Sequence, residues 1–448
     1  MDWAKLPDLA AVAALTCAFA SVARRGESSV SRLWLWGWLL ITLHFAAFMM
    51  LSWPGNAGLF AANVGLAALV DAGILFMYAS VPYRNEQSSK WMLFSLIATS
   101  TLYVYVLNAS PTLDWALTPI SIAFGGIPLT LALYVSPRFQ HALRWIVVGL
   151  FSTLSVFLLI FQHRPGNGGD LALNGLLFAV YFGCCLHVWY AYRRMTAGAL
   201  ITIFGFFGWA LVFVFAPLIL AINPAANPES EVWNLPKYIV AVGMMLLLLE
   251  DQVAHNRYLA LHDELTGLPN RRLFLDRLTS ALERARRTGT RAALLVVDLD
   301  QFKQVNDSLG HQAGDTLLKE VGAIFTSRIR NSDTVARTGG DEFSLILEDT
   351  TDRASAGQVA MTLLERLNEP FIIRERPVWV GASIGVALFP DDATDMEGLC
   401  VAADLRMYNQ KNEMRGSIDD AKQKIHGRSQ SQTDLPTDFR LTAGRHLA

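Results

Sequence analysis

Long apolar stretches fill the first 250 residues of this chain and constrain its fold more than any other feature. Of the 76 charged side chains, 22 lie in residues 1–250 and 54 in the remaining 198. A helix needs about 20 apolar residues to cross the core of a bilayer. Nine stretches reach or approach that length: 6–23, 33–53, 57–82, 91–109, 113–135, 142–161, 171–192, 199–222 and 236–250. The sequence thus predicts an all-α polytopic membrane region over residues 1–250. The expected number of spans is nine, or eight if one of the two short stretches, the first or the last, does not cross the membrane.

Basic residues in the connections predict the orientation of these spans. Cytoplasmic connections carry an excess of Lys and Arg. One alternating set of connections holds nine basic residues: Arg24, Arg25, Arg32, Arg84, Lys90, Arg138, Arg144, Arg193 and Arg194. The N-terminus and the other connections hold three: Lys5, Arg164 and Lys237. We therefore expect the N-terminus outside the membrane and the chain after residue 250 in the cytoplasm.

The first apolar stretch could instead be a cleaved secretory signal, because Ala18-Phe19-Ala20 resembles a cleavage site. Two features favour a retained helix. The start of the chain carries Asp2 and Asp8 against Lys5, and cleavage would leave Arg24 and Arg25 on the outside.

Few polar side chains lie inside the predicted spans. Asp71 is near the middle of the third stretch, and an intramembrane carboxylate is a functional candidate. The alternative is a protonated or hydrogen-bonded Asp that faces a neighbouring helix. His44 and His187 could together ligate a haem, but no motif supports that interpretation.

Charge and cysteine content argue against two classes of function. The formal net charge is −2, so no basic excess indicates a nucleic-acid partner. The four cysteines, Cys17, Cys184, Cys185 and Cys400, have neither metal-ligand spacing nor the pattern of a disulfide framework.

Residues 251–262 read as a helical linker, because neither Gly nor Pro interrupts the chain between Glu250 and Gly267. The last membrane helix is therefore expected to continue into water. The apolar positions of this linker fit a heptad poorly, so they indicate a coiled coil only weakly. From residue 417 the chain is polar and aperiodic, which predicts a disordered tail over 417–448.

Helix and strand patterns alternate between the linker and the tail. A 3.6-residue period predicts helices, and buried apolar runs predict strands. Helices are expected at 272–287, 313–330, 354–370 and 399–413, and strands at 292–300 and 378–390. Residues 334–347 read as a β-hairpin around Gly339 and Gly340. This part of the chain is therefore expected to be an α/β domain.

Two carboxylates are expected to meet near the hairpin turn. Asp298 ends the buried strand, and Asp341 follows the glycine pair. If the hairpin and the strand are neighbours in one sheet, both side chains reach a common point, where they and substrate phosphates could bind Mg²⁺. The glycines let the backbone approach a nucleotide, and Lys303 could offer its ammonium to charge on a phosphate. The pattern indicates a phosphoryl or nucleotidyl transferase, and the alternative is an acidic hairpin tip in solvent.

Four sequence blocks extend this pattern in a fixed order. They are DELTGLPNRR (263–272), DLDQFKQVNDSLGHQAGD (298–315), RTGGDEF (337–343) and AADLRMYNQK (402–411). Together they make roughly residues 260–416 resemble the GGDEF family, the diguanylate cyclases, with the domain itself expected over 263–416. The resemblance implies a cyclase-like α+β sandwich, similar to ferredoxin and to the polymerase palm. It implies an enzyme that condenses two GTP into cyclic di-GMP and two pyrophosphates, and the predicted spans would place this enzyme in the bacterial inner membrane.

The resemblance implies the catalytic and metal-binding residues position by position. The Mg²⁺ ligands, with Mn²⁺ as an alternative metal, would be Asp298, Asp341 and the carbonyl of Leu299. Catalysis would rest on Asp341, Glu342 and Lys303, and the family leaves the role of the base open between the two motif carboxylates. Activity would require a homodimer, since each chain carries one set of GTP-binding residues and the product has two equivalent linkages.

The residues that bind GTP follow from the same resemblance. Asn306 and Asp315 would read guanine, because a carboxylate accepts from the ring N–H and the exocyclic amine. The remaining members would sit beside the nucleotide or balance phosphate charge, and they are His311, Arg337, Gly339, Gly340, Lys411 and Arg415. Asp263 and Asn270 are expected to organise the entrance of the domain.

Product inhibition is a further implication of the family pattern. Arg330 and Asp333 form an R-x-x-D at the predicted end of the helix 313–330, where the family has its inhibitory site for cyclic di-GMP. The closing block departs from the family, which has small residues in place of Arg406 and Gln410 and a glycine in place of Met414. These departures affect the expected positions of the Lys411 and Arg415 side chains.

A catalytically silent GGDEF module, which binds a nucleotide or a partner, is the alternative to an active cyclase. Silent members typically lose motif acids, whereas this chain keeps Asp298, Asp341 and Glu342. No EAL or HD-GYP phosphodiesterase block follows, so degradation of cyclic di-GMP is not expected.

Overall fold

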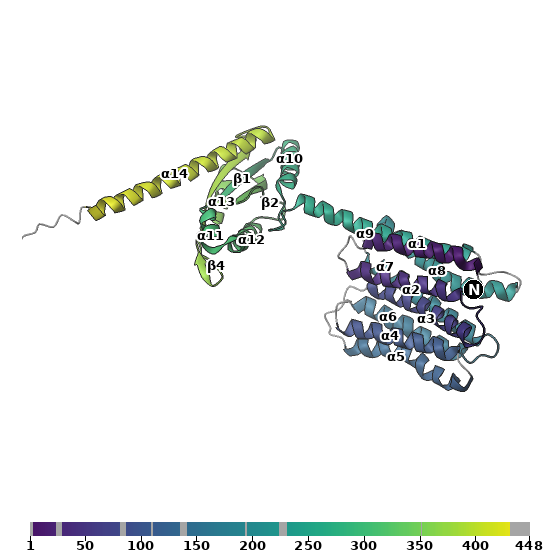
Figure 1. Ribbon diagram of the computed structural model, residues 1–448. Helices are drawn as coiled ribbons and strands as arrows, with labels where there is room; N and C mark the ends of the chain where they lie inside the picture. Colours follow the sequence, from purple (N-terminus) through teal and green to yellow (C-terminus); the bar gives the residue numbers. More distant parts are fainter. Residues whose placement is uncertain are drawn as a thin grey trace, which may run out of the picture. The chain divides into compact units, whose positions relative to one another are not determined.

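The computed structural model of the chain describes residues 3–23, 29–80, 87–108, 111–134, 141–192, 195–223, 231–350 and 352–430. The chain divides into two compact units, Met1–Ala254 and His255–Ala448. Figure 1 shows that the first unit is helical and that the second is built on a β-sheet.

The described part of the first unit contains nine α-helices and three short 3₁₀ helices, and the ninth α-helix continues past Ala254. The α-helices are α1 (Leu6–Ala23), α2 (Ser29–Phe48), α3 (Asn56–Ala79), α4 (Gln87–Leu107), α5 (Leu117–Tyr134), α6 (His141–Phe161), α7 (Gly168–Ala191), α8 (Ala197–Ile222) and α9 (Leu235–Leu261). Within the described residues, eight helices are long and apolar enough to cross a membrane. The shorter apolar segment is Trp145–Phe161 of α6. The first and last stretches are both among these eight, and α9 continues past Glu250 to Leu261.

The polar side chains of the predicted spans have hydrogen-bond partners. Asp71 on α3 accepts from two hydroxyls of α4, those of Ser100 at 2.7 Å and Thr101 at 2.9 Å. The Nδ1 atoms of His44 and His187 lie 2.8 and 2.7 Å from backbone carbonyl oxygens. These contacts favour the hydrogen-bonded interpretation of Asp71.

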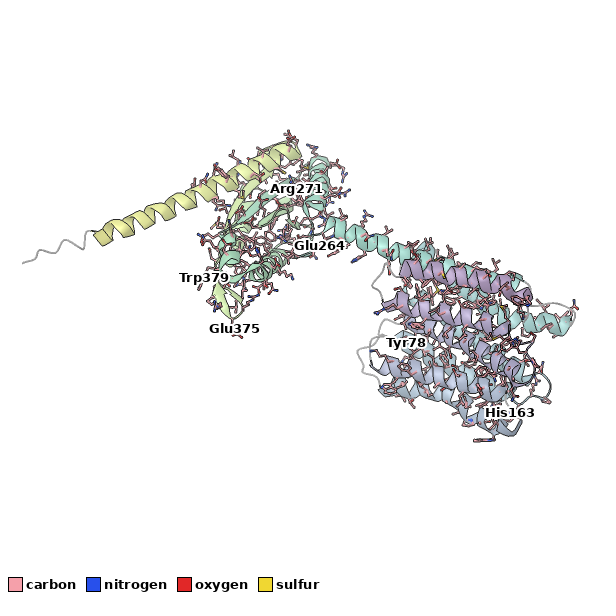
Figure 2. All side chains as sticks on the ribbon, viewed as in Figure 1. Tyr78, His163, Glu264, Arg271, Glu375 and Trp379 are labelled. Carbon is pink, nitrogen blue, oxygen red and sulfur yellow. The ribbon has the colours of Figure 1, made fainter. Side chains whose placement is uncertain are left out.

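The second unit is a four-stranded antiparallel sheet with helices on both faces. Its elements are α10 (Arg271–Thr288), β1 (Arg291–Asp300), α11 (Phe302–Leu309), α12 (His311–Arg328), β2 (Thr334–Arg337), β3 (Glu342–Thr350), α13 (Arg353–Leu367), β4 (Phe371–Ile373), β5 (Arg376–Val378), β6 (Gly381–Phe389) and α14 (Met396–Gln430). The strand order is β2-β3-β1-β6, and β4 and β5 form a separate hairpin, on which Figure 2 labels Glu375 at the turn. The predicted fold class, a helical region followed by an α/β domain, is confirmed.

The alternation of side chains along β1 determines how the two helix layers attach. Successive side chains of a strand point to opposite faces of the sheet. The odd-numbered residues of 293–299 pack with α12 and α13, and the even-numbered residues of 292–296 pack with α10 and α14. Asp298 continues the even set, so its carboxylate lies on the α14 side.

The second unit differs from the sequence prediction in three places. The chain turns between α11 and α12 at Gly310, whose φ of 85° favours glycine. The β4–β5 hairpin escapes the sequence pattern because each strand has only three residues. The predicted tail begins as helix, since no proline interrupts α14 before Gln430. Residues 431–448 of that tail lie outside the described residues.

Candidate functional site

The ends of β1 and β3 bring the predicted metal-site residues together. In the antiparallel pairing, Asp298 stands opposite Glu342. The backbone N–H of Leu299 donates to the carbonyl oxygen of Asp341, with an N···O distance of 3.3 Å. The hairpin and the buried strand are therefore neighbours, and three carboxylates gather where the two strands meet the glycine turn.

Lys411 of α14 reaches this group of carboxylates. Its Nζ donates to Oδ1 of Asp298 and forms an ion pair with it. Asp298 is buried, with 8% of its surface exposed, and a buried carboxylate needs such a partner. The contact is possible because the even-numbered residues of β1 face α14. The structure thus places Lys411 at the predicted metal ligand.

Negative charge is concentrated around Glu342. Burial raises the pKa of this carboxyl above its ordinary value. The carboxylates of Asp298, Asp341 and Asp404 raise that pKa further, and the ammonium of Lys411 acts in the opposite direction. A divalent cation would relieve the repulsion, and oxygen ligands beside a flexible turn suit Mg²⁺.

The donor set fits an open magnesium site rather than a closed cage. Within the described part of the chain, no three His, Cys, Asp or Glu side chains converge to hold a metal on their own. Mg²⁺ is usually bound by one or two carboxylates and completed by waters and substrate phosphates. Asp298 and Asp341 match that requirement.

The guanidinium of Arg337 fixes the glycine turn. Its guanidinium donates to the carbonyl oxygen of Gly340 at 2.7 Å and forms an ion pair of 3.0 Å with Asp263. Burial raises the pKa of Asp263, but hydrogen bonds from Thr266 and the Arg337 guanidinium outweigh burial and hold this pKa below its ordinary value. Arg337 is thus bonded within the domain, and its predicted contact with phosphate stays a prediction. Asp263 thereby connects its own turn to the glycine turn, and its role at the entrance of the domain stays a prediction.

The two glycines of the turn have different surroundings. A Cβ on Gly339 would lie 2.6 Å from Oε2 of Glu342, whereas a Cβ on Gly340 would meet nothing within 4 Å. Gly339 therefore lets the Glu342 side chain fold against the turn. Gly340 leaves its outer side open, as a close approach of nucleotide requires.

The predicted guanine-reading residues lie together on α11 and α12. Asn306 is half-buried on α11, while His311 begins α12 and Asp315 lies four residues further along that helix, both exposed. Residues four apart share one face of a helix. A Cβ on Gly314 would lie 2.0 Å from Oδ1 of Asn306, so any larger residue there would displace the Asn306 side chain. Lys303 is exposed on α11, one turn before Asn306.

Arg330 and Asp333 lie in a turn, because α12 ends at Arg328, two residues earlier than predicted. The two oxygens of the Asp333 carboxylate accept from the backbone N–H groups of Arg330 and Glu348, at 3.0 and 3.1 Å. The two residues line a cavity of about 190 Å³ between this turn, the end of β3 and the start of α13. Asp333 therefore holds the loop together beside the cavity. The side chain of Arg415, the remaining predicted residue, lies outside the described part of α14.

Comparison with protein families agrees with this geometry. The family model described as diguanylate cyclase, GGDEF domain, matches residues 260–417. These residues form a GGDEF domain. It spans the whole sheet and every residue that the sequence predicts for the site.

Two relatives from Pseudomonas aeruginosa resemble part of the chain. The bifunctional diguanylate cyclase/cyclic di-GMP phosphodiesterase MucR is 42% identical over 187 residues, which are 42% of this chain and 27% of MucR. The diguanylate cyclase TpbB is 39% identical over 170 residues, which are 38% of this chain and 39% of TpbB. The chain therefore matches less than half the length of either relative. Among solved structures, a TpbB mutant comprising only the GGDEF domain is 38% identical, with a TM-score of 0.34, and the match covers 34% of this chain and 89% of that one.

Asp404 of α14 adds negative charge near Glu342, and the sequence pattern does not single it out. Burial raises the pKa of Asp404, and the Arg271 guanidinium at the start of α10 (Figure 2) opposes that rise. The charge of Asp404 in turn contributes to the raised pKa of Glu342. The available signal is helical spacing, because Asp404 stands two turns before Lys411 on α14.

Proposed function

We propose that the protein is a membrane-bound diguanylate cyclase that condenses two GTP into cyclic di-GMP and two pyrophosphates. The observation that carries the proposal is the pairing of β1 with β3, which puts Asp298 beside Asp341 and Glu342 at a glycine turn. The GGDEF domain and a relative named as a diguanylate cyclase support it.

The carboxylate end of the sheet would carry the chemistry. Asp298, Asp341 and the carbonyl of Leu299 are the groups that would hold Mg²⁺ or Mn²⁺, and the bound ion would offset the charge that develops on phosphate. Glu342 has a raised pKa, so its carboxylate is a stronger proton acceptor than an ordinary one. Glu342 and Asp341 are the two candidates for accepting the proton of the ribose 3′-hydroxyl.

The α11–α12 end would hold the nucleotide. Asn306 and Asp315 would bond the edge of guanine, with His311 between them. Lys303, Lys411, Arg337 and Arg415 would balance phosphate charge. In a two-fold homodimer, each site would supply one attacking hydroxyl, so symmetry would account for both linkages of the product.

The first unit would act as a sensor region in the bacterial inner membrane. Eight described helices long and apolar enough to span support that location. The excess of basic residues in alternate connections supports an outside N-terminus and a cytoplasmic GGDEF domain. We assign residues 1–250 to the sensor, 251–262 to the linker and 263–416 to the enzyme. The helix α9 runs without interruption through the linker, which offers a continuous route for a signal.

Arg330 and Asp333 would provide product inhibition. An Arg side chain can stack on a guanine and donate a fork of hydrogen bonds, and the cavity beside Arg330 offers space for a base. Because Asp333 also holds its own loop, Arg330→Ala is the cleaner variant. We expect added cyclic di-GMP to lower the wild-type kcat more than it raises KM for GTP. Arg330→Ala should lose that response, whereas a change at exposed Arg287 should not. Coincident inhibition curves for the wild type and Arg330→Ala would remove the inhibitory role.

A catalytically silent GGDEF module is the competing interpretation. The test is to supply the purified full chain, in lipid vesicles, with GTP and Mg²⁺ and to quantify the products. The cyclase proposal predicts one cyclic di-GMP and two pyrophosphates for each pair of GTP consumed. A chain that binds GTP and forms no cyclic di-GMP would support the silent module instead.

A further inference from the structure

Helix α14 packs directly on β6, the strand at one edge of the four-stranded sheet. The approach is closest at Gly385, where an added Cβ would lie 2.0 Å from the carbonyl oxygen of Ala403 and 2.5 Å from the backbone nitrogen of Met407. Glycine is therefore required for the helix backbone to reach the strand. Two long side chains of α14, Arg406 and Gln410, lie beside this contact.

Both side chains form hydrogen bonds with the edge of β6 that does not pair with β1. Oε1 of Gln410 accepts from the backbone N–H of Ile384 at 2.7 Å, and Arg406 donates to the carbonyl oxygen of Val386 at 2.6 Å. In an antiparallel strand, residues two apart direct their backbone groups to the same side. Two strand residues span about 6.8 Å and four helix residues about 6 Å, so the two contacts match in spacing.

Arg406 is fixed by a second set of bonds. Its guanidinium donates to both carboxylate oxygens of Asp392, at 2.6 and 2.7 Å. Asp392 also accepts from the backbone N–H of Leu388 at 2.7 Å. Hydrogen bonding from Arg406 holds the pKa of Asp392 well below its ordinary value. The forked, charge-assisted geometry restricts how far the helix can rotate or slide.

The bonds of Arg406 and Gln410 determine where Lys411 lies. Lys411 follows Gln410 directly, and its Nζ bonds Asp298. In the pairing of β1 with β6, Asp298 stands opposite Ser383, the neighbour of Ile384. The bond from Gln410 to the strand therefore lies one residue from the point where Lys411 meets the metal-site carboxylate.

We propose that Arg406 and Gln410 are positioning residues of the cyclase, which hold α14 in register on β6 and thereby keep the Lys411 ammonium at Asp298. The inference rests on the proposed cyclase function. It gives a role to the two positions at which the closing block departs from the small residues typical of the family. A small side chain at either position would not reach the open edge of the strand.

A double-mutant cycle in the full chain, reconstituted in lipid vesicles, tests the inference. Its members are the wild type, Gln410→Ala, Lys411→Ala and the double variant. If Gln410 acts through Lys411, Gln410→Ala lowers kcat roughly tenfold in the wild type and has no further effect in Lys411→Ala. Gln410→Glu keeps an acceptor oxygen and should retain most of the wild-type rate. The same cycle, measured on GTP binding by equilibrium dialysis, needs no turnover.

Controls separate positioning from stability and from the cyclase proposal itself. Asn409→Ala changes an exposed residue of the same helix and should leave kcat and GTP binding unchanged. Arg406→Lys keeps the positive charge but loses the forked pair of hydrogen bonds to Asp392. It replaces Gln410→Ala in the double-mutant cycle if that variant does not fold. Equal effects of Gln410→Ala with and without Lys411 would overturn the inference, as would a fully active Gln410→Ala. A wild type that binds GTP without forming cyclic di-GMP would remove only the cyclase proposal, and one that binds no GTP would remove both.

Discussion

At the scale of single residues, the ionisation of Glu342 gives the site a pH dependence. Burial and three neighbouring carboxylates raise its pKa, so the ionised form is less favourable in the folded domain than in the unfolded chain. We predict that Glu342→Gln raises the thermal midpoint of the GGDEF domain by about 1–3 °C near neutral pH. The gain should shrink below the ordinary carboxyl pKa, where Glu342 is protonated in both states. Calorimetry at several pH values measures this, and a lower midpoint at neutral pH would contradict it.

The close contact between Gly314 and Asn306 leads to a second prediction at the scale of single residues. An added Cβ would lie 2.0 Å from Oδ1 of Asn306, so Gly314→Ala must displace the predicted guanine reader. We expect kcat/KM for GTP to fall roughly ten- to a hundredfold, mainly through KM. Gly357→Ala on α13 is the matched control, because nothing lies within 4 Å of its added Cβ. Unchanged kinetics in a folded Gly314→Ala would show that Asn306 does not read the base.

At the scale of elements, the ion pair between Asp263 and Arg337 ties the turn after α9 to the glycine turn before β3. We predict that Asp263→Ala lowers the free energy of unfolding of the GGDEF domain by about 1–3 kcal/mol at neutral pH, because it leaves hydrogen-bond donors without a charged acceptor. The pKa of Asp263 is depressed, so its stabilisation is present above the ordinary Asp pKa and is lost as the pH falls through the folded-state value. Denaturant titration at several pH values tests this. A loss of stability that is unchanged by acid would point to packing instead of charge.

Local patterns predict the parts of the site that depend on one strand or one turn. The apolar run before Asp298 and the glycines before Asp341 suffice to predict a strand, a hairpin and their meeting point. The bonds of Arg406 and Gln410 to β6 are not predictable in that way, because each joins residues about twenty positions or more apart. The same holds for Lys411 and Asp298, whose contact depends on which face of β1 meets α14. The sequence predicts helix as far as Arg330, two residues too far, because Ile329 continues the apolar spacing of α12.

At the scale of the whole molecule, the proposed reaction needs two copies of the chain. Each GGDEF domain carries one set of site residues, whereas the product needs two attacking hydroxyls. We predict that the rate per chain falls as the protein in vesicles is diluted with lipid, once the monomer predominates. Cross-linking at each dilution reports the fraction of dimer. A rate per chain that stays constant while the dimer disappears would contradict the two-fold mechanism.

The most direct test of the central claim is the activity of Asp341→Asn in the full chain. The exchange removes one charge from the carboxylates at the glycine turn and leaves the size of the side chain unchanged. We predict that the wild type forms cyclic di-GMP from GTP and Mg²⁺ and that Asp341→Asn loses at least about a hundredfold of that rate, since a metal ligand contributes several kcal/mol. Asp276→Asn, at an exposed position of α10, should keep the wild-type rate. A folded Asp341→Asn with near-normal synthesis of cyclic di-GMP would contradict the account.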